Sequence, residues 1–522
     1  MKPVTKHGIA VLDFGSQFTQ LITRRLRELG YYSEIFPFSV SPALLKEKGV
    51  KGIILSGGPN SVYEKESPKA DVKELLNVAP VLGICYGMQL ITHQLGGKVE
   101  KADHREYGLN RVHWEIPLDS VPNPQTVWMS HGDVVVEPPP GFKVTGRSDS
   151  QHIAAIGGSV ELAKGAVSCW AVQFHPEVAH SQEGDKILKA FCEELCALKA
   201  DWKAPAIAQI LKDKMKSEVQ DKVLCAISGG VDSSVVATLL TQSLGPDQVY
   251  CVFVNTGLLR YQEYETVMSS YKALGLNVKG VDASEEFYTA LKGVSDPEKK
   301  RKIIGKLFID IFEREVHHSQ DLQNINFKYL AQGTLYPDVI ESVSSVGGSV
   351  TIKSHHNVGG LPDKMKLKLV EPLRDLFKDE VRRVGEELGL PKPILWRHPF
   401  PGPGLAIRIM GEVTPEAVEI VRSCDHIFIS KLREYGLYDK IWQAFCVLLP
   451  VQTVGVQGDS RTYEKVLALR AVTSSDGMTA DWYPFTFEFL REVSNEITNK
   501  VKGVNRVVYD VTSKPPGTIE WE

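Results

Sequence analysis

No stretch of the sequence reaches the roughly eighteen continuous apolar residues that a membrane-spanning helix needs. The only early apolar run is interrupted by Asp13, so the pattern of a secretory signal peptide is also missing. We therefore expect a cytoplasmic protein that has no membrane partner.

The eight cysteines include no C-x-x-C pair and no spacing typical of a zinc site. Several of them lie inside apolar runs, which is typical of buried, reduced thiols in a cytosolic protein. Positive charge is not in excess either, because the formal net charge is -4. The sequence lacks the excess of basic residues that is typical of nucleic-acid binding, and we expect no nucleic-acid partner.

The chain is too long for one ordinary domain, because 522 residues correspond to about two to four domains. An alanine- and lysine-rich helical pattern near residues 195–210 indicates a first boundary. Several prolines and glycines between residues 391 and 403 indicate a second. We predict three domains, at residues 1–200, 205–396 and 397–522.

Short apolar runs at residues 9–12, 52–55 and 80–84 have the pattern of buried strands. Glycine-containing turns follow them, and helical patterns separate them. This alternation favours an α/β fold, a doubly wound parallel sheet whose site lies at the carboxyl ends of the strands. A second α/β unit starts at Val223, with residues 249–254 as its next strand.

A glycine- and serine-rich loop connects the apolar run at residues 222–227 to the one at 235–240. The first run has the pattern of a strand, and the second can continue as a helix. Backbone N–H groups at a helix start bind anions, and glycines let the backbone approach a phosphate closely. The loop is therefore a candidate phosphate cradle, formed by Ser228, Gly229, Gly230, Val231, Asp232, Ser233 and Ser234.

This loop differs from the phosphate loop of kinases and GTPases, because no lysine precedes its serines and an aspartate is present instead. An ordinary Gly-Ser turn at a helix N-cap is the alternative. The order of strand, glycines, aspartate and serines resembles the loop of the N-type ATP pyrophosphatases, which cleave ATP to AMP and pyrophosphate. That resemblance implies that ATP is a co-substrate.

A second candidate site follows the strand at residues 80–84, where Cys85 stands between two glycines. A tight turn here exposes a nucleophile at a helix N-terminus. A cysteine nucleophile needs a base, and the base needs an orienting group. His175 and Glu177, in Phe-His-Pro-Glu, can supply both. Each element alone is weak evidence, since a cysteine in an apolar run is usually a core residue.

Taken together, these three side chains resemble the catalytic set of the class I glutamine amidotransferases. The resemblance implies that Cys85 attacks the side-chain amide of glutamine and that His175 protonates the leaving ammonia. Glu177 is then implied to orient His175. An α/β-hydrolase-like unit or an inactive unit is the alternative.

Three further segments resemble parts of the same family. Ser56-Gly57-Gly58-Pro59 matches its oxyanion loop, so the backbone N–H groups near Gly58 and at Tyr86 are implied to face the developing oxyanion. Gln89 matches a glutamine-holding position. Ser130-His131-Gly132-Asp133 fits the family less specifically.

The order of amidotransferase, pyrophosphatase loop and C-terminal region resembles the glutamine-hydrolysing GMP synthases of bacterial type, over essentially all of the chain. Residues 398–405 and 514–522 carry the C-terminal part of this resemblance. It implies a class I amidotransferase domain, an adenine-nucleotide α-hydrolase-like ATP pyrophosphatase domain and an α+β C-terminal dimerisation domain. It also implies that ATP adenylates XMP at the C2 oxygen, and that ammonia displaces AMP to give GMP.

The same resemblance implies a homodimer, and Mg2+ on the ATP phosphates with Asp232 as a direct or indirect ligand. It implies a lid over ATP that contains Lys353, His355 and His356. Lys378 and Asp379 are weaker candidates for the ATP site. Their position on the solvated face of a helix explains these two charged residues about as well. The XMP-binding positions that it implies are Arg301, Asp459, Lys514, Ile519 and Glu520.

Charge supports part of this nucleotide set, because Arg301 and Lys514 suit an anionic ligand. A mobile polar tail is the alternative for Lys514 and Glu520.

Two other functions remain open for the chain as a whole. One keeps the ATP site with another small-molecule acceptor, and the C-terminal motifs argue against it. The other is a regulatory glutamine-binding module, and the intact Cys85, His175 and Glu177 argue against that.

Overall fold

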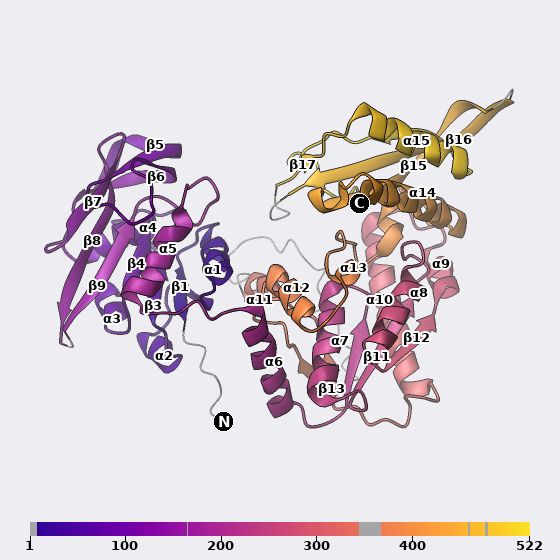
Figure 1. The fold of residues 1–522 in the computed structure, drawn as a ribbon, viewed down its shortest axis with the longest axis horizontal. Helices are drawn as coiled ribbons and strands as arrows, with labels where there is room; N and C mark the ends of the chain where they lie inside the picture. Colours follow the sequence, from indigo (N-terminus) through magenta and orange to yellow (C-terminus); the bar gives the residue numbers. More distant parts are fainter. Residues whose placement is uncertain (1–7, 164, 344–366, 458–459, 475–478) are drawn as a thin grey trace. The chain divides into compact units, whose positions relative to one another are not determined.

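The structure is a computed structural model that describes residues 8–163, 165–343, 367–457, 460–474 and 479–522. The chain divides into two compact units, Met1–Ile207 and Ala208–Glu522 (Figure 1). This division falls within the region near residues 195–210 where the composition indicates a boundary. The finer bounds of three domains stay a prediction.

The first unit contains a nine-stranded sheet whose first half is parallel. Its central strands are apolar because they are buried on both faces. Strands β1 (Ile9–Asp13), β3 (Gly52–Leu55) and β4 (Val81–Ile84) coincide with the three apolar runs, so those strand predictions are confirmed. Strand β2 (Ser33–Pro37) pairs with β1 at the edge.

The other half of this sheet is antiparallel, which the sequence pattern above does not indicate. The strand order is β2-β1-β3-β4-β9-β8-β7-β5-β6. Strand β9 is parallel to β4 and antiparallel to β8, so it joins the two halves and makes the sheet mixed. The five added strands are β5 (Lys98–Trp114), β6 (Gln125–Glu137), β7 (Lys143–Ser148), β8 (Ile153–Leu162) and β9 (Gly165–Val172).

Helices cover both faces of this sheet and enclose two apolar clusters. Helices α2 (Pro42–Glu47), α3 (Val72–Leu76) and α4 (Tyr86–Gln94) contribute to one cluster. Helices α1 (Thr19–Glu28) and α5 (Gly184–Ala190), with the π-helix Phe191–Leu195, contribute to the other. Because α4 follows β4 directly, the turn between them lies at the carboxyl end of a central strand.

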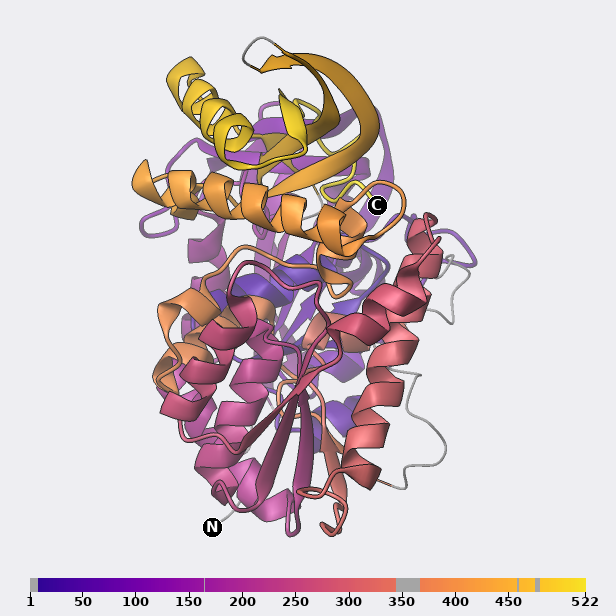
Figure 2. The same ribbon diagram turned by 90° about the vertical axis from the view of Figure 1, so that its right-hand side faces the viewer.

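The second unit contains a five-stranded parallel sheet in the order β12-β11-β10-β13-β14. Its strands lie between helices on both sides (Figure 2). The sequence predicts two of these strands, and both are confirmed. The strands are β10 (Val223–Ile227), β11 (Val249–Asn255), β12 (Val278–Asp282), β13 (Tyr329–Ala331) and β14 (Lys368–Val370).

The helices of this part include α7, which starts directly after the glycine- and serine-rich loop and is largely buried. None of the helices within the described ranges is long and apolar enough to cross a membrane. The helices are α6 (Ala204–Glu218), α7 (Val231–Leu244), α8 (Glu263–Ala273), α9 (Ser284–Leu291), α10 (Pro297–His318), α11 (Tyr336–Val343), α12 (Lys378–Glu387) and α13 (Lys392–Leu395).

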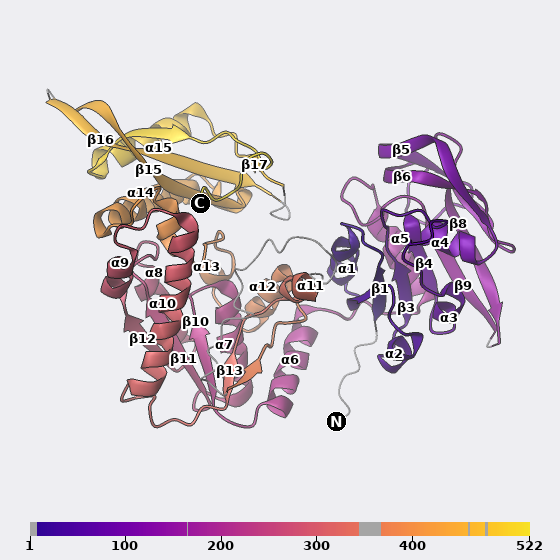
Figure 3. The same cartoon turned by 180° about the vertical axis from the view of Figure 1, so that it is seen from behind.

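The chain ends in a second sheet of the same unit, in which β15 pairs with β16, and β16 with β17 and β18. One apolar cluster combines residues of β11, α14 and β15, so the two sheets of this unit share a core across α14 (Figure 3). The elements are β15 (Gln443–Gln457), β16 (Ser460–Thr473), β17 (Asp481–Trp482), β18 (Val504–Tyr509), α14 (Pro415–Glu434), α15 (Phe487–Lys500) and the 3-10 helices Gly404–Arg408 and Tyr438–Lys440.

Candidate functional site

Cys85 stands in a strained turn between β4 and α4. Its φ of 54 and ψ of -107 lie outside the regions that most L-residues adopt. The flanking glycines leave space for this turn. A Cβ atom at Gly87 would lie 2.4 Å from the Leu55 carbonyl oxygen, and one at Gly83 would lie 2.7 Å from the Gly87 carbonyl. The geometry is that of a nucleophile elbow.

The thiol of Cys85 is almost fully buried and faces two partners. Its S–H group donates to the Ser130 carbonyl oxygen, with a distance of 3.6 Å from Sγ. It also shares a hydrogen bond with the His175 ring. Gly57 lies beside both residues, because a Cβ atom there would lie 3.0 Å from Cε1 of His175 and 3.6 Å from Cβ of Cys85. The oxyanion loop and the cysteine turn therefore meet.

His175 lies between the thiol and a buried carboxylate. Its Nδ1 atom is 2.7 Å from Oε1 of Glu177, whose side chain is fully buried. Burial disfavours the charged ring, but the Glu177 carboxylate and the Cys85 sulfur outweigh burial and raise the pKa of His175 to about 10. The ring can therefore hold a proton at neutral pH and deliver it to a leaving group.

Two backbone N–H groups at this turn are available to a ligand. In the part of the chain that the structure describes, the N–H groups of Gly58 and Tyr86 have no acceptor. The two residues are close, because a Cβ atom at Gly58 would lie 3.4 Å from the Tyr86 ring. Such a pair at a helix N-terminus can donate to a developing oxyanion.

Gln89 lies one turn of α4 after Cys85, and its backbone N–H donates to the Cys85 carbonyl at 3.2 Å. Its side chain is buried, and its Nε2 group donates to the Asp133 carbonyl oxygen at 3.1 Å. The Asp133 carboxylate in turn accepts from the Tyr63 hydroxyl at 2.8 Å. The sequence motifs indicate Gln89, but they do not indicate that Tyr63 reaches this site.

The glycine- and serine-rich loop of the second unit joins β10 to α7 as predicted. Gly229 has a φ of +72, a conformation that glycine adopts without strain. Ser228 is exposed, and its hydroxyl lies 3.3 Å from that of Ser233. Ser234 differs from them, because its buried hydroxyl donates to the Gly230 carbonyl at 2.6 Å and pairs with the Tyr271 hydroxyl. The open side of the loop thus presents Ser228 and Ser233.

The carboxylate of Asp232, in the first turn of α7, contacts the ammonium group of Lys378. Its other oxygen, Oδ1, is buried and has no hydrogen-bond partner within the described residues. Gly333 lies against Asp232, because a Cβ atom there would lie 3.1 Å from the Asp232 Cβ. Asp379, the neighbour of Lys378, pairs instead with Arg383 at 2.5 Å.

Arg397 is a further residue at this loop that the sequence motifs do not indicate. Its guanidinium group contacts the Gly229 carbonyl oxygen and lies 2.6 Å from the Glu263 carboxylate. Glu263 begins α8, so Arg397 connects the loop to that helix. The signal in the sequence is its position, since Arg397 directly precedes the proline- and glycine-rich motif that starts at His398.

The C-terminal tail returns to the second unit, where Glu520 is held by two side chains. Arg408 donates to its carboxylate at 3.0 and 3.3 Å, and Gln443 donates at 2.6 Å. Arg408 is fully buried and stacks over the Phe445 ring at 4.3 Å. The carboxylate of the tail residue Glu520 is thus paired with both side chains.

Arg301 and its neighbour Lys300 both contact Glu522 at the end of the tail. Arg301 donates to the Glu522 backbone oxygen at 2.5 Å, and Lys300 lies 2.6 Å from its side-chain carboxylate. Lys300 is fully buried and also donates to the Ala406 and Ile409 carbonyl oxygens. Lys300 belongs to a basic run at residues 299–302. Such runs usually mark solvated helix faces, so the sequence does not indicate that this lysine is buried.

Lys514 and Ile519 both lie next to Ala480. Lys514 forms an antiparallel bridge with Ala480, through backbone hydrogen bonds of 2.7 and 3.1 Å. Ile519 is buried and shares a small apolar cluster with Ala480 and Phe445. The structure therefore places Lys514 and Ile519 beside Ala480, and the carboxylate of the next residue, Glu520, pairs with Gln443 of β15. Asp459 and the lid residues Lys353, His355 and His356 lie outside the described residues.

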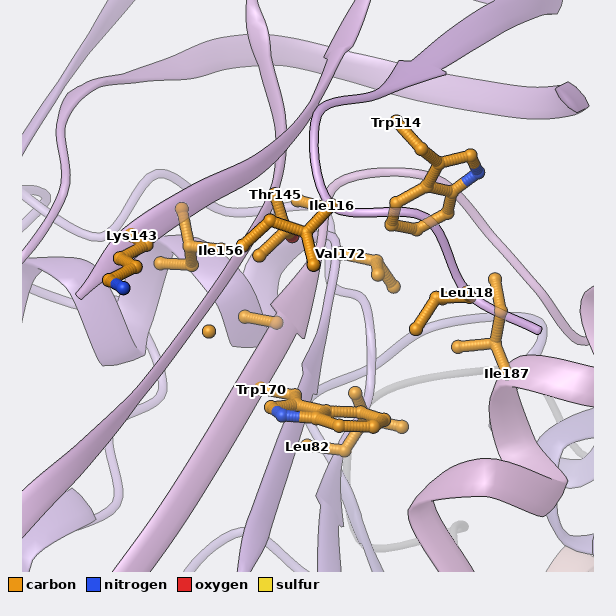
Figure 4. A pocket seen from close by; sticks show the side chains of 13 residues that line it. Leu82, Trp114, Ile116, Leu118, Lys143, Thr145, Ile156, Trp170, Val172 and Ile187 are labelled. Carbon is orange, nitrogen blue, oxygen red and sulfur yellow. The ribbon is translucent and has the colours of Figure 1, made fainter. Parts of the chain in front are cut away.

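A separate cavity of about 240 Å³ lies within the first unit, and the residues that line it include none of the predicted site residues (Figure 4). Trp114 and Trp170 lie on different sides of it. Leu82 and Val172 belong to β4 and β9, the strands beside the cysteine turn, but their side chains face this apolar space.

The models of three protein families match this chain. The glutamine amidotransferase class-I model matches residues 10–195, and the NAD synthase model matches residues 204–306. The model of the GMP synthase C terminal domain matches residues 430–521. These regions contain the cysteine turn, the glycine- and serine-rich loop and the C-terminal tail, respectively.

Several relatives match over nearly the whole chain, and each is a glutamine-hydrolyzing GMP synthase. The relative from Bdellovibrio bacteriovorus is 66% identical over 517 residues, which are 99% of this chain and 100% of the relative. That from Cytophaga hutchinsonii is 54% identical over 98% of this chain and 99% of the relative. That from Chlorobaculum tepidum is 53% identical over 99% of both. This chain therefore belongs to the glutamine-hydrolysing GMP synthase family.

Proposed function

We propose that this chain converts XMP to GMP with ATP and with ammonia from glutamine. The observation that carries the proposal is the placement of His175 between the Cys85 thiol and the Glu177 carboxylate. A ligase of this family needs a source of nitrogen, and a cysteine, histidine and carboxylate in contact can hydrolyse an amide.

The glutaminase half begins with attack of the Cys85 sulfur on the side-chain carbonyl carbon of glutamine. The N–H groups of Gly58 and Tyr86 donate to the oxyanion that forms. His175 gives its proton to the departing ammonia, and Glu177 holds the ring in position and stabilises its charge. Water then cleaves the glutamyl thioester, which releases glutamate and restores the thiol.

The ATP half uses the loop from Ser228 to Ser234. The backbone and the hydroxyls of Ser228 and Ser233 hold the pyrophosphate of ATP, while Ser234 and Val231 fix the start of α7 from inside. The C2 oxygen of XMP bonds to the α-phosphorus, and the bond to pyrophosphate breaks. Ammonia then adds at C2, and AMP leaves. The lid at residues 351–360, with Lys353, His355 and His356, remains part of this proposal.

Mg2+ is the metal that we propose for the ATP site. The donor set fits, because Asp232 offers a carboxylate whose Oδ1 has no hydrogen-bond partner within the described residues. Mg2+ is usually bound by one or two carboxylates together with substrate phosphates. When bound, it would neutralise the charge of the phosphates. Lys378 contacts the same carboxylate and adds a positive charge beside it.

The XMP site that we propose lies at the C-terminal tail. Arg301 and Lys514 supply positive charge for an anionic nucleotide, Ile519 an apolar contact, and Asp459 a carboxylate from outside the described residues. The pairing of Glu520 with Arg408 and Gln443 supports a fixed orientation of its carboxylate, which can then accept a purine N–H group.

A homodimer through the C-terminal sheet completes the proposal. The hairpin of β15 and β16 exposes a group of apolar side chains, and Val454 lies directly opposite Tyr463. Exposed apolar patches on a sheet favour association. The exposed fractions are 52% for Val451, 51% for Val454, 73% for Val456 and 61% for Tyr463.

The compartment that we propose is the cytoplasm. Its reducing environment is supported by the eight cysteines, which are all free and buried.

Conversion of XMP tests the proposed function directly. The full-length chain is mixed with XMP, ATP, Mg2+ and glutamine, and loss of XMP absorbance is followed while GMP, AMP, pyrophosphate and glutamate are quantified. We expect the four products in equal amounts. An ATP-dependent reaction that leaves XMP unchanged would contradict the proposal and would favour another acceptor.

A further inference from the structure

A buried ion pair joins β5 to β6 in the amidotransferase unit. The Nε2 atom of His131 lies 3.0 Å from Oε2 of Glu106, and these side chains are only 1% and 4% exposed. Burial would raise the pKa of the Glu106 carboxyl, but the His131 ring and nearby serine hydroxyls lower it to about 2. Buried charges are costly unless they are paired and hydrogen-bonded, so this pair is a candidate for a specific role.

Both ring nitrogens of His131 face acceptors. Nε2 faces the Glu106 carboxylate, and Nδ1 lies 3.0 Å from the Asp133 carbonyl oxygen. The Nε2 contact lies within ion-pair distance, whereas the Nδ1 contact is a hydrogen bond. Glu106 has further neighbours, since Asn110 donates to its Oε1 at 3.0 Å and Nδ1 of His152 lies 3.5 Å from its Oε2.

The backbone on each side of His131 contacts the helix that carries the cysteine. The carbonyl of Ser130 accepts from the Cys85 thiol, at 3.6 Å from Sγ. The carbonyl of Asp133 accepts from the Gln89 side chain at 3.1 Å and from the His131 ring at 3.0 Å. The His131 ring thus contacts the Asp133 end of a four-residue segment whose two end carbonyls, those of Ser130 and Asp133, face Cys85 and Gln89.

Strand pairing is interrupted at this segment. The register of β5 against β6 shifts between Lys101 and Glu106, so residues 102–105 have only Gly132 opposite them. Within the segment from Ser130 to Asp133, Gly132 is therefore the residue that the strand ladder leaves without a partner. Pairing resumes where Glu106 lies directly opposite His131, so the ion pair adds a side-chain constraint at the end of the interrupted stretch.

We propose that Glu106 and His131 are positioning residues for glutamine hydrolysis. They hold the segment from Ser130 to Asp133 against the start of α4, so that the space beside Cys85 keeps the shape that binds glutamine. Neither residue takes part in bond making. The inference rests on the proposed function, because it assumes that glutamine is hydrolysed at Cys85.

The test is Glu106→Gln in the full-length chain. Loss of the carboxylate leaves the His131 ring without its charged partner, so the segment loses its anchor. We expect the KM for glutamine to rise about tenfold or more, with kcat at saturating glutamine within about threefold of wild type. GMP formation from ammonium chloride should stay within about twofold, and iodoacetamide should alkylate Cys85 at the wild-type rate.

A matched control and a second variant keep the test decisive. Glu115→Gln removes a carboxylate, just after β5, from an exposed pair with Arg147 of β7, and it should leave the KM for glutamine unchanged. If Glu106→Gln does not fold, the double variant Glu106→Gln/His131→Asn removes both charges and leaves none unpaired. It should raise the KM for glutamine in the same way.

A wild-type KM for glutamine in Glu106→Gln, or in the double variant, would overturn the inference. Loss of glutamine and ammonium activities in parallel would also overturn it, because that result indicates a general structural role. Failure of the proposed function is distinguishable from both. In that case wild type would form no GMP from XMP, or Cys85→Ala would still use glutamine, whatever the effect of Glu106→Gln.

Discussion

The ammonium group of Lys378, at the start of α12, contacts the carboxylate of Asp232, at the start of α7 and 146 residues earlier in the chain. The contact places a cation beside the only acidic residue of the glycine- and serine-rich loop. Charge-assisted hydrogen bonds to phosphate are stronger than neutral ones. Lys378 is therefore in a position to serve both the aspartate and the ATP phosphates.

Lys378→Met should raise the KM for ATP by about tenfold, a loss of roughly 1.4 kcal/mol of binding free energy. The reaction with ammonium chloride is the assay, because it bypasses the glutaminase site. Arg383→Met is the control, since Arg383 lies on the same helix and forms an ion pair with the partly exposed Asp379. Equal KM values for ATP in the two variants would contradict a role for Lys378.

The pH dependence of glutamine hydrolysis should follow the His175 proton. The pKa of the ring is raised from 6.5 to about 10, so the proton is present throughout the neutral range and is lost as the pH approaches 10. Glu177→Gln removes the carboxylate that raises this pKa, and burial then lowers it. We expect the alkaline decline of kcat for glutamine to move to lower pH in Glu177→Gln.

The measurement is a pH profile of glutamate release between pH 6 and about pH 10, the range set by the His175 pKa. The ammonium-dependent reaction of the same variant gives the control profile, which should match that of wild type. An alkaline limb that does not move in Glu177→Gln would show that another group controls it.

Gly87→Ala should abolish glutamine use while leaving ammonium use intact. The added Cβ would lie 2.4 Å from the Leu55 carbonyl oxygen and 2.7 Å from the Leu55 Cβ, so α4 must move away from β3. That movement displaces the Tyr86 N–H group, and loss of one oxyanion donor costs about 100-fold or more in kcat. Gly305→Ala, on α10, is the control because a Cβ there meets no atom within 4 Å. Normal glutaminase activity in Gly87→Ala would contradict the tight turn.

The Glu106–His131 pair should also give the stability of the chain a distinct pH dependence. The folded-state pKa of Glu106 lies at about 2, below the ordinary 4.5, so its contribution is present above pH 4.5 and is lost as the pH falls toward 2. A shift of this size corresponds to about 3 kcal/mol. In urea unfolding, Glu106→Gln should be less stable than wild type at pH 7, and the difference should narrow below pH 4.5. A difference that stays constant down to pH 3 would contradict the cited pKa.

The parts of the fold that follow from the sequence are those with strong local patterns. Strands β1, β3, β4, β10 and β11 are continuous apolar runs, because parallel strands are buried on both faces. Strand β5 is different, since most of its 17 residues are exposed or half-buried and give no apolar run. Its place is fixed by pairing with distant strands, which a local pattern does not contain.

The same distinction applies to the sites. The Cys85 turn and the loop at Ser228 are local motifs, so the sequence indicates both. Glu520 pairs with Arg408 across 112 residues, and Lys300 with Glu522 across 222. Nothing in the sequence near Arg408 or Lys300 marks these contacts, because they arise only when the tail folds back onto the second unit.

The most direct measurement of the two-site account compares nitrogen sources in one variant. Cys85→Ala is assayed for GMP formation with glutamine and, separately, with ammonium chloride, each with XMP, ATP and Mg2+. The account predicts that the glutamine reaction is abolished and that the ammonium reaction keeps its wild-type rate. Loss of both reactions, or survival of the glutamine reaction, would contradict it.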